Sequence, residues 1–257
     1  MAEPPDLVAE RHLWILDRVL NARRVVTTDA ADELGVSVDT VRRDLRALHD
    51  RGLVRRVHGG AIPAAKLPRS FTGRTGESGE TRPVLASAVV ERFRAGQVIG
   101  LDAGSTSVEI AALVPPTLAI TVVTNNPAAA VALADHPVTT VILLGGPVDL
   151  NWMATVGSEV VDGWRNYRLD LAVVGICGFD FAAGATTNSH AEVATKRALI
   201  GSAAETIVPV QAEKLGTAAP FVVADTAELD VLVVESHTYA GFLQSCREAA
   251  IDVVLAP

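Results

Sequence analysis

The stretch Ser37-Val38-Asp39-Thr40-Val41-Arg42-Arg43-Asp44-Leu45 decides how residues 1–61 fold. Within and just beyond it, apolar side chains recur at i, i+4 and i+7, at Val41, Leu45 and Leu48. This spacing predicts an amphipathic helix over residues 38–50, because one apolar stripe then faces a core. Ser37 is a favourable N-cap for that helix, and Gly52 follows its expected end.

Two more helices are predicted upstream. Residues 7–21 place leucines at helical spacing and add a tryptophan expected to pack across the bundle: Leu13, Leu16, Leu20 and Trp14. A second helix over 29–34 takes either Thr27 or Thr28 as its N-cap, and Gly35 ends it. The tight turn 34–37 between two short helices is typical of a helix-turn-helix, whose second helix enters the major groove of DNA.

Short strands complete this first domain. Val25-Val26 forms one, and residues 53–57 form another that turns at Gly59-Gly60. The resulting hairpin carries Arg55, Arg56 and His58, which suits a wing on the DNA backbone or in the minor groove. We therefore predict a winged helix-turn-helix over residues 1–61.

The polar face of the 38–50 helix supplies the predicted DNA contacts. Arginine is the commonest reader of guanine, so Arg43 is the first candidate for base contact and Thr40 the second. Ser37 and Arg42 are better placed for phosphates, and Arg46 suits either role. Asp39 projects from the same side of the helix. Asp44 has no derivable base-reading role, and we expect it to orient an arginine internally.

Charge is distributed unevenly along the chain. The net charge of −8 comes entirely from residues 61–257, because residues 1–60 hold ten arginines and ten acidic residues. Residues 42–56 carry six arginines against Asp44 and Asp50, a local excess of four positive charges. Attraction to a polyanion depends on this local face more than on the whole chain. The first domain therefore suits double-stranded DNA, and the acidic remainder does not.

Composition excludes several other classes of protein. At 257 residues, 49% hydrophobic and 20% charged, the chain is globular. No apolar run reaches the roughly 18 residues of a membrane span, and the acidic N-terminus has no secretory signal. Cys177 and Cys246 match no metal or redox spacing. We expect a cytoplasmic protein with no metal, no cofactor and no membrane partner.

Residues 62–82 lack periodicity and are predicted to be a linker. Beyond it, residues 83–257 alternate apolar strands with helices, which predicts an open, mostly parallel α/β sheet covered on both faces. The expected strands are 98–101, 118–123, 138–144, 169–174, 206–210, 231–234 and 251–255. The expected helices include 84–94, 105–113, 127–134, 191–204 and 239–249.

Polar loops follow three of these strands. The first reads Asp102-Ala103-Gly104-Ser105-Thr106-Ser107 and opens a helix, whose free N–H groups form an anion site. It matches neither the P-loop nor the dinucleotide fingerprint. Thr124-Asn125-Asn126 and Gly145-Gly146 follow the next two strands. Because ligands bind at the carboxyl ends of parallel strands, the three loops predict a small-molecule pocket.

The opening motif, with Gly52-Leu53 and Arg56-Val57-His58-Gly59-Gly60-Ala61, resembles the DeoR family of bacterial regulators. The resemblance continues through Leu101–Thr106, Val123–Asn125, Leu144–Gly146 and Glu192 with Lys196. It implies a sensor domain akin to ribose-5-phosphate isomerase that binds phosphorylated sugars or related metabolites. The implied effector residues are Asp102, Gly104, Ser105, Thr106, Thr124, Asn125, Gly145, Gly146, Lys196 and Lys214.

Two departures from the family pattern bear on the effector. Where the family often has Asp-x-Ser-Lys, this chain has Gln211-Ala212-Glu213-Lys214, and Asp149 replaces a common basic residue. An anion near a phosphate pocket weakens binding of a dianion, so the effector is expected to carry less charge or to sit differently. Glu192 and Lys196 also have a plain alternative, a surface ion pair at i, i+4.

Two rival functions remain at this stage. One is a sugar-phosphate isomerase with a DNA-binding arm, for which Asp102, Asp180 and Glu192 are available as bases. The other is a module whose arginine helix binds an acidic protein. We expect instead a transcription regulator, commonly a repressor, of a carbohydrate-related operon and with no catalytic residue. It would act as a homo-oligomer, a dimer or tetramer, with paired helices on repeated half-sites.

Overall fold

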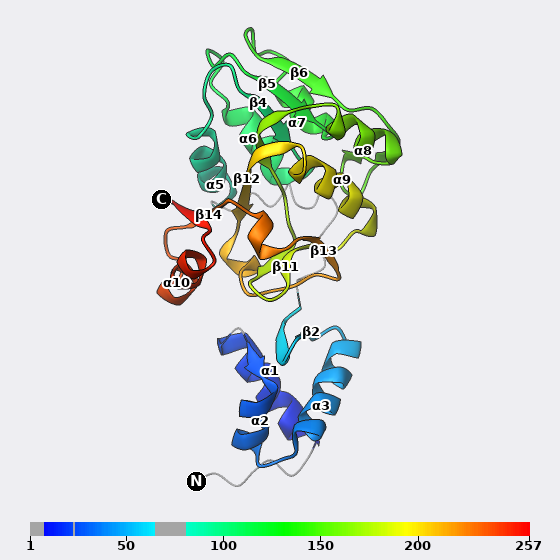
Figure 1. Ribbon diagram of the computed structural model, residues 1–257, viewed down its shortest axis with the longest axis vertical. Coiled ribbons are helices and arrows are strands. Elements are labelled where there is room, and N and C mark those ends of the chain that lie inside the picture. Colours follow the sequence, from blue (N-terminus) through cyan, green and yellow to red (C-terminus); the bar gives the residue numbers. More distant parts are fainter. Residues whose placement is uncertain (1–7, 23, 65–80) are drawn as a thin grey trace.

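The computed structural model describes residues 8–22, 24–64 and 81–257. The chain forms a small N-terminal lobe and a larger C-terminal lobe, which meet near strand β2 (Figure 1). The small lobe contains the predicted winged helix-turn-helix. The large lobe contains a parallel sheet with helices on both faces. None of the helices within these described ranges is both long and apolar enough to cross a membrane.

The winged helix comprises three helices and three short strands. Their order is α1 (Val8–Ala22), β1 (Val25–Val26), α2 (Thr27–Leu34), α3 (Val38–Asp50), β2 (Val54–Val57) and β3 (Gly60–Pro63). The strands form an antiparallel sheet in the order β1-β3-β2. The predicted stripe Val41, Leu45 and Leu48 is buried in the core of this lobe. Ser37 caps α3 as predicted, because its side chain accepts from the Thr40 N–H.

Two local predictions in this lobe are wrong. Helix α2 begins at Thr27 with Val26 as its N-cap, and no side chain caps it, so neither threonine has the predicted role. Leu13 is 67% exposed, whereas Ile15 and Val19 of α1 are buried. The buried face of α1 is therefore centred on Ile15 and Val19 and not on the predicted leucines. Gly35 does end α2, in the left-handed conformation at φ 64°.

The large lobe is built on seven parallel strands in the order β15-β14-β12-β9-β4-β5-β6. These are β4 (Val98–Leu101), β5 (Thr121–Thr124), β6 (Thr140–Leu143), β9 (Leu169–Val173), β12 (Ala203–Val210), β14 (Val231–Glu235) and β15 (Asp252–Ala256). All seven predicted strands are present. Strand β12 starts three residues early, so the helix predicted over 191–204 ends at Ile200.

Helices cover both faces of this sheet, as the continuous apolar strands predict. One core packs the sheet against α5 (Thr81–Val90), α6 (Ser105–Leu113) and α7 (Pro127–Ala132). The other packs it against α8 (Ser158–Arg165), α9 (His190–Ile200) and α10 (Ala240–Glu248). Neighbouring strand residues alternate between the cores, as Val122 and Val123 do. Helix α8 was not predicted from the sequence.

Smaller elements that lack a clear sequence pattern surround the sheet. An antiparallel sheet of order β10-β11-β13 comprises Gly178–Asp180, Gly184–Thr187 and Phe221–Ala224. A hairpin pairs β7 (Val148–Asp149) with β8 (Ala154–Thr155), and two 3-10 turns, η1 and η2, span Ala212–Lys214 and Thr226–Glu228. Strand β3 and helix α5 extend into both ends of the predicted 62–82 linker, and residues 65–80 lie outside the described residues.

Candidate DNA interface and effector site

Helix α3 presents a polar face whose first turn is fixed by its cap. The Thr40 N–H donates to Ser37 Oγ at 3.1 Å, and the two hydroxyls lie 2.8 Å apart. Asp39 and Arg42 form an exposed ion pair at 3.0 Å, with 82% and 63% of their side chains accessible. Asp39 and Arg42 are therefore paired on the exposed side of the helix.

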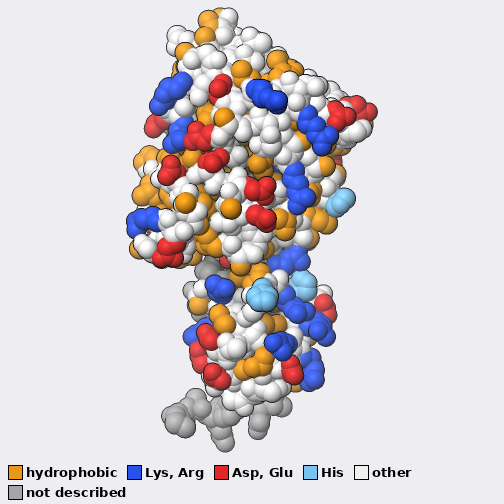
Figure 2. Space-filling model, in the orientation of Figure 1, with side chains coloured by type: hydrophobic (Ala, Val, Ile, Leu, Met, Phe, Trp, Pro, Cys, Tyr) orange, Lys and Arg blue, Asp and Glu red, His pale blue; other side chains and the backbone are white. Residues whose placement is uncertain are grey.

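Further arginines extend this exposed face. Arg43 and Arg46 are exposed on α3, and Arg56 and His58 are exposed on the hairpin of β2 and β3. In Figure 2 the small lobe carries a group of basic side chains on the side where Figure 1 places α3. The arginine-rich face predicted for α3 therefore coincides with the basic side of the lobe.

Arg55 differs from the other predicted wing residues. Its side chain is only partly exposed, and its Nη2 is buried without a hydrogen-bond partner among the described residues. Desolvation by burial lowers the pKa of this guanidinium. Arg55 is therefore less accessible than Arg56 and His58, which are both exposed.

Asp44 lies on the inner side of α3, and its prediction is confirmed. It is 4% exposed and accepts hydrogen bonds from Arg11 of α1, at 2.8 Å from Nε and 3.3 Å from Nη2. His12 Nε2 lies 3.3 Å from Asp44 Oδ1, the oxygen that also accepts from Arg11 Nη2. The hydrogen bond to Asp44 raises the pKa of Arg11. This buried pair fixes the rotation of α3 against α1 and removes one negative charge from the DNA-facing surface.

In the large lobe, the ends of β4 and β5 converge as predicted. Gly104, at φ 141°, opens α6, and its carbonyl accepts from Asn126 Nδ2 at 3.0 Å. Thr124 Oγ1 donates to the carbonyl of Leu101 at 2.6 Å. These bonds hold the 102–107 loop against the 124–126 loop, with Ser105 and Ser107 buried at the helix N-terminus and Thr106 partly exposed.

Asp102 and Lys196 form a buried ion pair, although they are 94 residues apart in sequence. They are 1% and 3% exposed, and Lys196 Nζ also lies 3.5 Å from Glu192. Burial alone would lower the pKa of Lys196, but Asp102 and Glu192 together raise it above its ordinary value. The surface ion-pair alternative for Glu192 and Lys196 is therefore wrong. Lys196 is charged, and two carboxylates neutralise it.

Two buried side-chain oxygens lack hydrogen-bond partners in residues 8–22, 24–64 and 81–257: Asn125 Oδ1, just beyond β5, and Thr195 Oγ1, on α9. Asn125 uses its Nδ2 to donate to the Thr155 carbonyl at 3.1 Å. Thr195 precedes Lys196 on the inner face of α9. An unpaired buried oxygen is costly, and a ligand hydroxyl is one group that satisfies it.

The remaining predicted effector residues lie around the same strand ends. Lys214 Nζ donates to the Ile176 carbonyl at 2.9 Å, and the adjacent Gly175 N–H donates to Asp102 at 2.9 Å. Gly145 and Gly146 are exposed beyond β6. Asp149 accepts from the Asn151 N–H at 2.9 Å and so shapes the β7–β8 hairpin, which accounts for an acid at this position.

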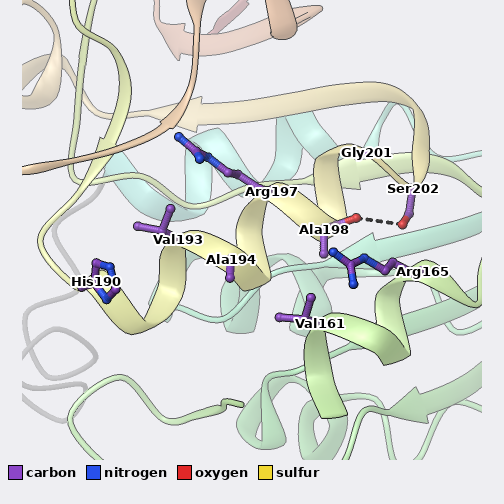
Figure 3. Close-up of a pocket in the computed structure, with 9 residues that line it drawn as sticks. All are labelled: Val161, Arg165, His190, Val193, Ala194, Arg197, Ala198, Gly201 and Ser202. Carbon is purple, nitrogen blue, oxygen red and sulfur yellow. Dashed lines mark hydrogen bonds between the residues drawn. The ribbon is translucent and has the colours of Figure 1, made fainter. Parts of the chain in front are cut away.

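The polar cluster is closed in this structure, because Asp102, Thr124, Asn125 and Lys196 are each at most 3% exposed. A separate groove of about 470 Å³ lies on the opposite side of α9. There Val161 of α8 faces Ala194 and Ala198 of α9 (Figure 3). None of the predicted effector residues lines it, so the groove does not mark the predicted site.

Several residues outside the predicted set of effector residues organise the site. Asn126 bridges Gly104 and the start of α7, where its Oδ1 caps the helix at Ala128 and Ala129. Thr187 Oγ1 donates to Glu192 at 2.8 Å, and Thr155 Oγ1 donates to Leu144 at 2.7 Å. Asn126-Pro127 is a recognisable cap followed by a proline at N1. Nothing in the sequence pattern points to Thr155 or Thr187.

Solved structures with a related arrangement have low overall similarity. Ribose 5-phosphate isomerase A of Methanocaldococcus jannaschii is 16% identical, with a TM-score of 0.39 over 53% of this chain and 54% of that chain. The eIF2B beta subunit of Chaetomium thermophilum is 13% identical, with a TM-score of 0.43 over 86% of this chain and 65% of that chain.

Sequence comparison gives much closer matches. Residues 11–66 match the DeoR-like helix-turn-helix domain, and residues 78–236 match the DeoR C-terminal sensor domain. The HTH-type transcriptional regulator GlpR of Haloferax volcanii is 32% identical over 96% of this chain and 98% of its own. The glycerol-3-phosphate regulon repressor of Escherichia coli K12 is 26% identical over the same shares. This chain therefore belongs to the DeoR family of helix-turn-helix transcriptional regulators.

Proposed function

We propose that this protein represses a carbohydrate-related operon by binding its operator, and that a small sugar-type effector changes its operator affinity. The observation that carries the DNA-binding half is the arginine-rich face of α3, locked by the buried Arg11–Asp44 pair. The names of its relatives support the carbohydrate assignment, because one is the glycerol-3-phosphate regulon repressor and another a putative aga operon repressor.

Within the DNA interface, each residue type has a distinct proposed role. Arg43 reads a base edge through two donors, with Thr40 beside it. Ser37, Arg42 and Arg46 contact phosphates and set the register of the helix. Arg56 and His58, on the wing, contact the sugar-phosphate backbone of the DNA. Asp39 contributes to DNA binding indirectly by orienting Arg42.

The effector site supports a hydroxylated ligand of modest negative charge. Asn125 Oδ1 and Thr195 Oγ1 are free to accept or exchange hydrogen bonds with ligand hydroxyls. The N-terminus of α6 offers N–H groups to an anionic group. Lys196 adds little attraction, since the two carboxylates Asp102 and Glu192 more than offset its single positive charge. A sugar or polyol monophosphate, or an uncharged relative of one, fits this balance better than a more highly charged ligand.

We propose that the protein is not an enzyme. An isomerase needs a carboxylate free to take a proton from the substrate. Asp102 is committed to Lys196 and the Gly175 N–H, and Asp180 accepts from the Ala182 N–H at 2.9 Å. Purified protein should give no aldose–ketose turnover with ribose 5-phosphate. Turnover that is lost in Asp102→Asn would overturn this part of the proposal.

A fluorescence titration against the DNA upstream of its own gene tests the proposed function. We expect specific binding that weakens steeply with salt, since each phosphate contact releases counterions. The active form is proposed to be a cytoplasmic homo-oligomer, a dimer or tetramer, because paired helices match repeated half-sites. Absence of binding at low salt to any neighbouring intergenic DNA would count against a regulator.

Thermal-shift measurements against sugars, polyols and their phosphates then test the effector half. A bound ligand raises the melting temperature in proportion to the logarithm of its concentration above Kd, so millimolar additions reveal weak binding. The response should be strongest for hydroxylated compounds with at most one phosphate. Stabilisation only by bisphosphates would contradict the proposed charge balance.

A further inference from the structure

The chain that leaves the wing is hydrogen-bonded to the large lobe. Beyond the end of β3, Ala64 pairs with Ala218 in a parallel bridge, and the Ala218 N–H donates to the Pro63 carbonyl at 3.4 Å. Strand β3 is the central strand of the winged-helix sheet. Any displacement at residue 218 therefore acts on the strand that holds the wing hairpin together.

The wing is also buried on its second face. Ala61 lies in the winged-helix core, and successive strand residues point to opposite faces, so Ile62 points away from that core. Ile62 is nevertheless fully buried, and Pro63 is buried beside it. Burial of Ile62 and Pro63 therefore adds to the hydrogen bond between Ala218 and Pro63 in holding the C-terminal end of the hairpin.

The same part of the large lobe reaches the candidate effector site. We call residues 214–218 the coupling segment. At its start, Lys214 Nζ donates to the Ile176 carbonyl at 2.9 Å, and the Gly175 N–H donates to Asp102 at 2.9 Å. Within it, Thr217 Oγ1 donates to the Lys214 carbonyl at 2.8 Å. A continuous path of hydrogen bonds and peptide bonds therefore runs from Asp102 to Pro63.

The coupling segment is packed too tightly to absorb a shift locally. Leu215 bridges Phe179, and the Thr217 N–H donates to the Phe179 carbonyl at 3.3 Å. A Cβ added at Gly178 would lie 2.8 Å from the Thr217 carbonyl oxygen, so β10 and the coupling segment approach closely. Packed elements of this kind move as units rather than deform continuously.

We propose that the coupling segment transmits the state of the effector site to the wing. This proposal rests on the proposed function and gives the physical link between effector binding and operator binding. A ligand group that takes the Lys214 ammonium away from the Ile176 carbonyl moves the segment at one end. The Ala64–Ala218 bridge carries that movement to β3 and so changes the placement of Arg56 and His58. Both sites then bias one shared element, which is the physical requirement for coupling.

Hydrogen exchange of the full-length protein, without DNA or ligand, tests this link. Thr217→Val keeps the side-chain shape and removes the bond to the Lys214 carbonyl. Thr226→Val is the matched control, because Thr226 Oγ1 donates to the Phe181 carbonyl at 3.0 Å in the same lobe but off the path. Loss of one hydrogen bond should speed exchange of the backbone amides of the wing, residues 54–62, by about fivefold in Thr217→Val.

The control and a second variant make the result decisive. The rate of backbone-amide hydrogen exchange in residues 54–62 should be unchanged in Thr226→Val. Lys214→Met removes the hydrogen bond to Ile176 at the other end of the segment and should speed hydrogen exchange of the wing in the same way. This variant tests the proposal independently if Thr217→Val does not fold. Unchanged wing exchange in the folded variants, or equal acceleration in the control, would overturn the proposal. Because the readout needs no operator or effector, it can fail while the proposed function stands.

Discussion

Each lobe contains a buried ion pair, and the side chains around the two pairs are arranged differently. Asp44 binds Arg11 within the winged helix, and every functional side chain around it points outward from α3. Asp102 binds Lys196 within the large lobe, and the polar groups around it point inward to a closed cluster. The first pair orients a surface that is ready to bind. The second lies within a polar cluster that is closed to solvent in this structure.

The largest expected effect comes from breaking the pair in the small lobe. Asp44→Ala leaves the Arg11 guanidinium buried without its partner, which should cost about 3–5 kcal/mol of unfolding free energy. Urea unfolding followed by circular dichroism measures it. Asp39→Ala, on the exposed side of the same helix, should change stability by less than about 0.5 kcal/mol. Equal losses in both variants would mean that Asp44 has no special structural role.

Breaking the pair in the large lobe should cost somewhat less. Lys196→Met should lose about 3 kcal/mol at neutral pH, since Asp102 and Glu192 stay buried without their cation. The folded pKa of Lys196 is raised above its unfolded value of about 10.4. Its stabilisation is therefore fully present below that pH and is lost as the pH rises through the folded pKa.

Urea unfolding midpoints of the wild type and Lys196→Met, measured at pH 8 and pH 11, test whether the stabilisation by Lys196 falls as the pH rises. The gap between the two proteins should be wide at pH 8 and narrower at pH 11. A gap that widens with pH would show that Lys196 is not held in its charged form by the two carboxylates.

A smaller effect is expected from the cap of α3. Ser37→Ala removes the acceptor for the Thr40 N–H and should cost about 1 kcal/mol. Ser189 is the matched control, because it stands at the N-cap of α9 without a side-chain capping bond. Ser189→Ala should leave the unfolding free energy within about 0.5 kcal/mol. Equal destabilisation by the two changes would rule out a capping role for Ser37.

The smallest effect concerns a single phosphate contact. Arg42→Ala should lower the slope of log affinity against log salt by about one, and do so on every DNA sequence. Arg165→Ala is its control, because Arg165 pairs with Asp162 at 3.0 Å in the same i, i+3 geometry on the large lobe. Salt titrations by fluorescence anisotropy give both slopes. An unchanged slope in Arg42→Ala would remove Arg42 from the interface.

The contrast between the lobes also explains what the sequence could predict. The stripe of Val41, Leu45 and Leu48 is local and periodic, so α3, its cap and its exposed arginines follow from the sequence directly. The partner of Asp44 lies 33 residues away, and that of Asp102 lies 94 residues away. Those partners depend on how distant elements pack, which no local pattern records.

The strands that the sequence did not predict also depend on the packing of distant segments. Strands β10, β11 and β13 are three or four residues long, and β11 reads Gly-Ala-Thr-Thr, without the alternation that indicates a strand. Their pairing, and with it the contact between Ala218 and Pro63, arises only in the folded chain. The resemblance to a known family predicted a set of effector residues, whereas the burial of Asp102, Thr124, Asn125 and Lys196 could be seen only in the structure.

Operator binding by Arg43→Ala, compared with Arg165→Ala, tests the central claim most directly. Both changes remove one exposed arginine, the first from α3 and the second from the large lobe. Arg43→Ala should lose about 1–3 kcal/mol of discrimination between the operator and unrelated DNA, with its unfolding midpoint unchanged. Arg165→Ala should bind as the wild type does. Equal operator affinity in the two variants would contradict a recognition helix that reads DNA through Arg43.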